Sequence, residues 1–162
     1  VFSGAITAIE NGISNGDIVE IKSNKGRFLG YGHYNEGSIA IRIFELNQLT
    51  IDNAYWEGKI KKAISQRHHN LDINGKNNIY RLVHAEGDDM PGCIIDRYDN
   101  VIVMQFHSVG MWKLKEIFSK TIAKQLPEID VIYDKSENTL PEVLSKNFKS
   151  KTAILDRVLI VR

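Results

Sequence analysis

The sequence predicts an α+β protein in two parts, a small all-β unit followed by a mixed α/β domain of strand-strand-strand-helix-strand order. Three observations lead to this fold class. Residues 1–50 contain short apolar runs separated by Gly and Asn turns, which is typical of a small barrel or sandwich. Residues 52–69 carry apolar side chains at helical spacing. Residues 79–106 contain three strand-like runs, and a helix-like segment and a further strand follow them.

The first unit is expected to contain three strands, at residues 17–22, 27–34 and 38–44. Turn signals rich in Asn and Gly separate them, at residues 24–26 and 35–37. In the third run the isoleucines alternate and share one face, which leaves Arg42 on the other, polar face. So few residues make a marginal core by themselves, and we therefore expect the unit to pack against the C-terminal part of the chain.

A helix is predicted next, capped by Asp52 or Asn53 and running to about His69. Its apolar side chains fall at i, i+4, i+7 and i+8 and form a single stripe: Trp56, Ile60, Ala63 and Ile64. The domain boundary is placed just before this helix, near residues 49–51, and residues 70–78 are interpreted as a loop.

The second unit centres on residues 80–98, which read YRLVHAEGDDMPGCIIDRY. Two apolar runs flank a polar elbow and the turn pair Pro91-Gly92, so we expect two strands joined by a tight connection. The turn at Asp99-Asn100 then leads into a third strand at residues 101–106.

The remainder is predicted to contain a helix at residues 110–126 with an apolar row, ended by Pro127. A strand follows at residues 130–134. Capping-box spacing at residues 139–142 predicts a short helix to about Asn147. Residues 153–162 are interpreted either as a final strand pair or as the start of a further domain.

The composition is that of a soluble globular protein, with 43% hydrophobic and 25% charged residues. Lys plus Arg number 21 and Asp plus Glu number 20, so any affinity for nucleic acid must come from local clustering of charge. The one cysteine fits a reducing compartment, and no run suits a membrane span, so we expect a cytoplasmic protein. The chain begins with Val1 and not with Met, and we expect a fragment of a longer protein.

Two blocks resemble one known family. The order RLV-x-x-E-x-D-x-x-PG followed by an apolar run and DRY, within residues 81–98, is similar to the central domain of the RlmI-like 23S ribosomal RNA methyltransferases. The segments VFSGAI at residues 1–6 and GRFLGYGHYN at residues 26–35 resemble the PUA domain, a small RNA-binding β-barrel, that opens those proteins. The resemblance implies a PUA-like barrel at residues 1–50 and, at residues 51–162, a linking helix plus the central domain.

The resemblance also implies the chemistry of the longer protein. The family transfers a methyl group from S-adenosylmethionine to C5 of a cytosine, and its cofactor domain and attacking cysteine lie beyond the part matched. Gly30-Tyr31-Gly32 does not open a helix, so a strand interpretation is favoured over a cofactor loop. We therefore expect this chain to bind RNA and to be catalytically inert, without a bound cofactor.

Three groups are weighed as chemical sites and interpreted as structural. Cys93 follows a turn inside an apolar strand without a nearby base, which indicates a buried thiol. The acidic elbow, Glu86, Asp88 and Asp89, has the spacing of a solvated turn. The five histidines show no metal-ligand spacing.

The candidates for RNA contact are basic and aromatic residues, because phosphates take the charge and unstacked bases stack on flat rings. The set is Lys25, Arg27, His33, Tyr34, Asn35 and Arg42 on the first unit, with Arg97 on the second. A weaker basic cluster is Lys146, Lys149 and Lys151. The competing interpretation is that these residues form a solvated face of the barrel on which Tyr34 packs against its neighbours and contacts no RNA.

Two other classes remain open at this stage. The chain could be a free-standing PUA-type RNA-binding protein without catalysis. It could also be an oligomerisation module, a homodimer formed through the apolar face of residues 110–126 or through an exposed strand edge.

Overall fold

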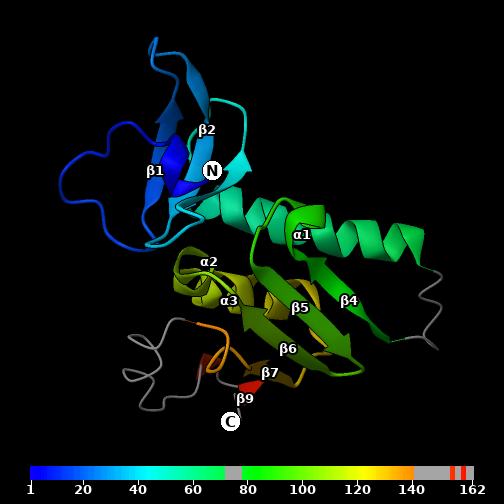
Figure 1. Cartoon of the computed structure of the whole chain (residues 1–162). Helices are drawn as coiled ribbons and strands as arrows, with labels where there is room; N and C mark the ends of the chain where they lie inside the picture. The colour runs from blue at the N-terminus through cyan, green and yellow to red at the C-terminus, as the bar shows by residue number, and fades with distance from the viewer. Residues whose placement is uncertain (72–77, 141–153, 156–157, 160–162) are drawn as a thin grey trace.

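The computed structural model describes residues 1–71, 78–140, 154–155 and 158–159 of the chain. A three-stranded sheet lies beside the N-terminal end of the long helix α1 (Asn53–Asn70), and a four-stranded sheet lies below that helix (Figure 1). The predicted α+β class and the order of its elements are confirmed.

The N-terminal sheet is antiparallel, in the order β1 (Ile18–Lys22), β2 (Phe28–Tyr34) and β3 (Ile41–Glu45). Each predicted strand is present, although the third begins at Ile41 and not at residue 38. The short helix η1 (Ser3–Ala5) follows Phe2, which bridges Ile39, so the chain start lies against the approach to β3. In the part expected to be a PUA-like barrel, the structure shows a three-stranded sheet with a bridged N-terminal segment.

Glycines set the close approach of β2 and β3. A Cβ on Gly32 would lie 2.4 Å from Cγ2 of Ile41, and one on Gly30 would lie 2.7 Å from the carbonyl oxygen of Glu45. The φ of Gly30 is +155°, which other residues rarely adopt. The strand interpretation of this glycine pair is confirmed.

Helix α1 begins as predicted. The Asp52 carboxylate accepts a hydrogen bond of 2.9 Å from the backbone N–H of Tyr55 and so satisfies a free donor of the first turn. The four residues of the predicted apolar stripe are all buried. They face the two sheets, while the lysines between them stay partly or fully exposed.

The central sheet has the order β4 (Ile79–His84), β5 (Cys93–Tyr98), β6 (Val101–Phe106) and β7 (Val131–Asp134). The first three strands are antiparallel neighbours, and β7 runs parallel to β6. A parallel pair requires a crossover, which two helices supply.

The crossover helices are α2 (Val109–Lys113) and α3 (Lys115–Gln125). The sequence predicted one helix here, but a turn at Leu114 divides it, where the backbone N–H bonds the carbonyls of Met111 and Trp112. The short helix η2 (Ala85–Asp88) similarly lengthens the connection between β4 and β5, which was expected to be tight.

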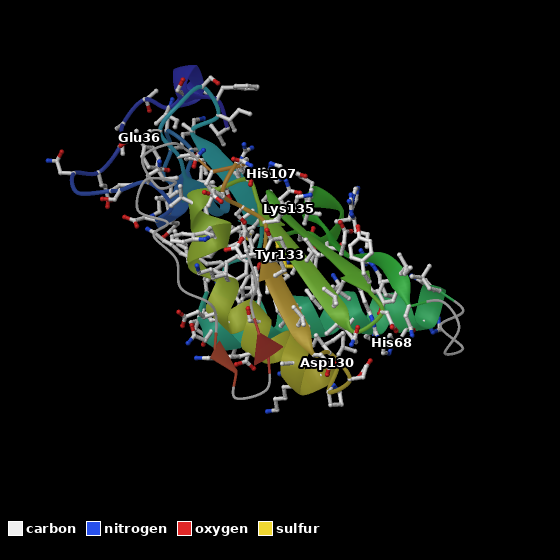
Figure 2. The ribbon with its side chains drawn as sticks, turned by 90° about the horizontal axis from the view of Figure 1, so that it is seen from below. Glu36, His68, His107, Asp130, Tyr133 and Lys135 are labelled. Atoms are coloured by element: carbon white, nitrogen blue, oxygen red, sulfur yellow. The ribbon has the colours of Figure 1, made fainter. Side chains whose placement is uncertain are left out.

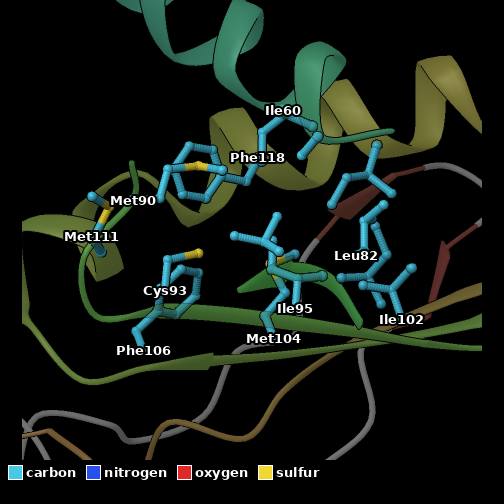
Figure 3. Close-up of a cluster of buried hydrophobic side chains, with 14 of the residues drawn as sticks. Ile60, Leu82, Met90, Cys93, Ile95, Ile102, Met104, Phe106, Met111 and Phe118 are labelled. Carbon is cyan, nitrogen blue, oxygen red and sulfur yellow. The ribbon is translucent and has the colours of Figure 1, made fainter. Parts of the chain in front are cut away.

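One hydrophobic core lies between the central sheet and the helices α1 and α3 (Figure 3). The predicted apolar row has four members, of which three are fully buried in this core and Leu114 is partly buried against it; the three are Met111, Phe118 and Ile122. That row is therefore used inside the chain and cannot also pair two chains, which corrects the expectation of a dimer through residues 110–126.

The N-terminal sheet and the central domain meet at α2. A Cβ on Gly110 would lie 2.2 Å from Cγ of His33, and one on Gly16 would lie 2.7 Å from Cγ1 of Val109. Lys113 Nζ also lies 3.0 Å from Oδ1 of Asp17. The predicted packing of the first unit against the C-terminal part of the chain is confirmed.

The chain end contains β8 (Ile154–Leu155) and β9 (Val158–Leu159), an antiparallel pair. This agrees with the strand-pair interpretation of residues 153–162. The helix expected at residues 141–147 and the lysines at 146, 149 and 151 lie outside the described residues. In the described ranges, no helix has the length and apolar character that crossing a bilayer demands.

Candidate nucleic-acid interface

A cavity of about 520 Å³ lies between the N-terminal segment and the turn from β2 to β3. It is lined by Ser3, Ile6, Thr7, Ala8, Ile9, Tyr34, Asn35, Glu36, Gly37 and Ala40. Two of the predicted RNA contacts, Tyr34 and Asn35, are therefore part of its wall. The wall offers a flat ring, an amide and two hydroxyls, all of which can contact a base.

Backbone hydrogen bonds hold the walls of this cavity. Ser3 donates to the carbonyl of Ser38 at 2.9 Å, and Asn35 donates to Ala40 at 2.7 Å. The second bond closes the predicted turn, in which Gly37 has a φ of +140°. The positions of Tyr34 and Asn35 thus follow from local turn chemistry.

The cations Lys25 and Arg27 lie at the turn from β1 to β2, the opposite end of β2 from Tyr34. Both are exposed. The N-terminal segment reaches this turn as well, because Thr7 Oγ1 donates to Oδ1 of Asn24 at 3.2 Å. A ligand in the cavity that continued past Thr7 would approach the turn that carries the two cations.

His33 does not join this set, because only 2% of its surface is exposed. Its ring stacks on Trp56 with centroids 5.6 Å apart and lies against Gly110. Burial, together with the charge of Lys113, lowers the pKa of His33 to about 4. The expectation of an RNA contact is corrected to a neutral ring that packs at the junction.

Arg42 lies on the face opposite Ile41 and Ile43, as expected, but this face of the sheet is packed and not solvated. It pairs directly with His33 across β2 and β3, so both side chains leave the sheet on the same side. Arg42 is half-buried, and its Nε has no hydrogen-bond partner within the part of the chain that the structure describes.

Arg97 is 4% exposed and has a structural role. Its Nε donates to the carbonyl of Asp99 at 2.8 Å, and its Nη1 lies 3.0 Å from Oε1 of Glu128. Its guanidinium also lies over the ring of Tyr80, 5.8 Å from the centroid. Arg97 is therefore engaged within the chain, and an RNA contact in this conformation is not supported.

The acidic elbow stabilises the connection after β4. Asp88 pairs with Arg67 through both oxygens, with Nη1 to Oδ1 at 2.7 Å, and accepts the backbone N–H of His84. Burial opposes ionisation of Asp88, but these hydrogen bonds and the charge of Arg67 outweigh it and lower the pKa. Asp89 lies near Lys59 and Lys62 at the surface.

A second cavity, of about 450 Å³, was not foreseen from the sequence. It is lined by Arg67, Ile79, Tyr80, Arg81, His84, Asp96, Arg97 and Tyr98, beside the edge strand β4. The signal that could have found part of it is the alternation of β5, which places Asp96 and Tyr98 on the face opposite the buried Ile95.

The described residues do not fit S-adenosylmethionine or a metal. Gly30 and Gly32 lie inside β2 and not between a strand and a helix. Cys93 is fully buried, and burial raises the pKa of its thiol, with the charge of Asp88 adding to the effect. Among residues 1–71 and 78–140 no group of three His, Cys, Asp or Glu could hold a metal ion.

Comparison with known proteins agrees with this arrangement. Residues 1–46 match the PUA-like domain family. The chain is 34% identical over 139 residues to ribosomal RNA large subunit methyltransferase I of Pseudoalteromonas atlantica, covering 85% of the chain and 35% of the relative. The same name, identity and coverage apply to a relative from Shewanella amazonensis. The chain thus spans about a third of the length of these curated relatives.

Solved structures show the same fold. A protein from Streptococcus mutans described as a SAM-dependent methyltransferase has a TM-score of 0.65 at 16% identity, over 78% of the chain and 34% of that protein. A methyltransferase complexed with SAH has a TM-score of 0.66 at 16% identity, over 80% and 34%. At this identity the likeness concerns the fold alone.

Proposed function

We propose that this chain holds and orients RNA for a ribosomal RNA methyltransferase. The chain is homologous over most of its length to the ribosomal RNA large subunit methyltransferases I, which confirms the resemblance to the RlmI-like family. The proposed substrate is 23S rRNA in the cytoplasm. The proposed reaction is methyl transfer from S-adenosylmethionine to C5 of a cytosine.

In this proposal, residues 1–50 bind RNA, and residues 51–162 form the linking helix and central domain. The match of residues 1–46 to the PUA-like family supports the first assignment. Methyl transfer itself is assigned to polypeptide outside these 162 residues, because the described residues do not fit the cofactor and the thiol of Cys93 is enclosed in the core.

The observation that carries the proposal is the N-terminal cavity with Tyr34 and Asn35 in its wall. An unstacked base can stack on the ring of Tyr34 while the amide of Asn35 bonds its edge. Lys25 and Arg27 are exposed at the turn near Thr7, where they can neutralise phosphates of the same strand.

A salt titration of RNA binding tests this assignment. Replacing Lys25 and Arg27 together by Ala should weaken binding of the 162-residue chain to a structured 23S rRNA fragment and flatten its dependence on salt, since each lost phosphate contact removes about 0.7–0.9 from the slope. The matched control replaces Lys120 and Lys124 by Ala. These lysines are exposed on α3, so the control removes the same charge from another face. Equal effects of the two pairs would contradict the assignment.

The reaction is tested in cells. Deleting the gene that encodes the chain should remove one 5-methylcytosine from 23S rRNA, and mass spectrometry of rRNA digests would detect the loss. An unchanged set of 5-methylcytosines would contradict the proposed reaction, while the proposed RNA binding would still stand.

A further inference from the structure

The central sheet has one covered and one open face in the described part of the chain. Helices α1 and α3 cover the face that carries the buried Ile95, Ile102 and Ile132. Strand residues of the other parity are exposed or half-buried, and Figure 2 shows Tyr133 and Lys135 on this open side of the sheet.

The second cavity lies at the β4 edge of the sheet, where Ile79, Arg81, Asp96 and Tyr98 line it from the open face and Arg67, Tyr80 and Arg97 line it from the covered side. Arg81 and Asp96 are opposite each other across β4 and β5, and Ile79 and Tyr98 form the next pair on the same face of the sheet. The volume of about 450 Å³ lies within the range of small-ligand sites. The cavity can therefore accept a group of about the size of one nucleotide.

Cations dominate the lining, which has three guanidinium groups and one carboxylate. Arg67 is held by Asp88, and Arg97 is held by Glu128. Arg81 is also paired, with Asp96 accepting from its Nε at 2.8 Å and from its Nη2 at 3.3 Å, and its Nη1 lies 3.4 Å from Nδ1 of His84. It differs from the other two in that 45% of its side chain is exposed. It can turn a free N–H toward a phosphate while it remains paired.

Exposed flat and apolar groups adjoin this cation. Tyr98 is 48% exposed and Ile79 is 64% exposed. An exposed tyrosine on an open sheet face, next to an arginine, is the arrangement on which proteins stack unpaired bases. A purely apolar protein partner would desolvate the guanidinium of Arg81 without offering it an acceptor.

We propose that this cavity, the β4–β5 cavity, binds one unpaired nucleotide of RNA, with the base stacked on Tyr98 and the adjoining phosphate paired with Arg81. The proposal deepens the proposed function, on which it rests, by adding a second RNA contact on the central domain. Stacking on an aromatic ring is sequence-tolerant, so the site is expected to discriminate weakly between RNA sequences. Asp96 competes with the phosphate for Arg81 and so weakens the phosphate contact.

The test measures fluorescence anisotropy of a labelled single-stranded decaribonucleotide with the 162-residue chain. Tyr98→Ala should weaken binding about 5- to 150-fold, which corresponds to the ~1–3 kcal/mol of one base–aromatic stack. Tyr98→Phe keeps the ring and should stay within about twofold of the unsubstituted chain. Asp96→Asn should strengthen binding, because it releases Arg81 from its competitor.

A charge-matched pair tests the phosphate contact. Arg81→Gln should weaken binding and reduce the salt slope by about 0.7, the value for one phosphate on a single strand. Lys135→Gln removes the same charge from the same face, outside the lining of the β4–β5 cavity, and should have a smaller effect. Thermal unfolding of each variant, unchanged within a few degrees, excludes loss of the fold.

The outcomes separate this site from the proposed function. Unchanged affinity of Tyr98→Ala, with binding still lost when Lys25 and Arg27 are replaced, overturns the β4–β5 cavity alone. Failure of the unsubstituted chain to bind RNA overturns both. A dimer in sedimentation that Tyr98→Ala dissociates, without an effect on RNA affinity, would identify the face as a contact between copies and also overturn this inference.

Discussion

The N-terminal sheet and the central sheet differ in the source of their buried contacts. The central sheet shares an extensive core with α1 and α3. The N-terminal sheet contributes Phe44 to that core and buries His33 against Trp56 and Gly110, which belong to the rest of the chain. The central domain therefore holds most of the buried contacts, and we expect the N-terminal unit to depend on its junction with that domain.

The largest expected effect comes from Trp56→Ala, because Trp56 contacts both Phe44 and Phe118. Truncation should cost about 3–5 kcal/mol of unfolding free energy. Urea unfolding followed by circular dichroism would measure it. Hydrogen exchange should show protection lost in β1–β3 before β4–β6, and equal loss in both sheets would contradict the dependence of the first on the second.

The next largest effect on stability is expected from a lower pH, because His33 is buried as a neutral ring. Its pKa in the folded chain is about 4, below the usual 6.5, so the unfolded chain binds the extra proton first as pH falls. The free energy of unfolding is therefore not reduced by His33 above about pH 6.5, and it falls as the pH drops from 6.5 to 4. The largest loss from this one group is about 3 kcal/mol. Urea unfolding between pH 7 and 4 should show a shallower decline for His33→Phe, and identical declines would contradict it.

Gly110→Ala tests the fit at the junction. The added Cβ would overlap His33, and overpacking of this kind costs about 1–3 kcal/mol. Combining it with His33→Ala should recover part of the loss in a double-mutant cycle measured by urea unfolding. The control is Gly58→Ala in α1, where a Cβ meets no atom within 4 Å; it should stabilise the chain by about 0.5–1 kcal/mol.

Asp88→Asn is expected to lower the stability of the central domain without a selective effect on the N-terminal sheet. It breaks the paired contact with Arg67 and should cost about 1.5–2 kcal/mol in urea unfolding. Asp89→Asn at the exposed neighbouring position should change stability by less than about 0.5 kcal/mol. If Asp88→Asn also lowered hydrogen-exchange protection of β1–β3 selectively, the two sheets would not differ as described.

Much of this fold follows from periodicity. The apolar stripe of α1 and the order of strands and helix along the central domain depend on local spacing, and both predictions are confirmed. Of the two cap candidates, Asp52 or Asn53, the structure has Asp52. The division of the predicted helix at Leu114 could not be foreseen, because it depends on packing between elements and not on a breaking residue such as Pro or Gly.

Candidate site residues were harder to predict because exposure depends on pairing between strands. Alternation within β3 placed Arg42 on the polar face, but its partner across the sheet is the buried His33. Arg97 shares the parity of Cys93 and Ile95 along β5, so its burial was readable from the sequence. The positions of Tyr34 and Asn35 followed from turn residues, which act locally.

The contact between Gly110 and His33 has a consequence for how this protein can change over evolutionary time. A methyl group at position 110 would overlap an imidazole at position 33, so a substitution at one position changes the packing at the other. Among natural homologues, a larger residue at one position is expected to occur together with a smaller residue at the other. Such paired substitutions would preserve the angle between the N-terminal sheet and the central domain.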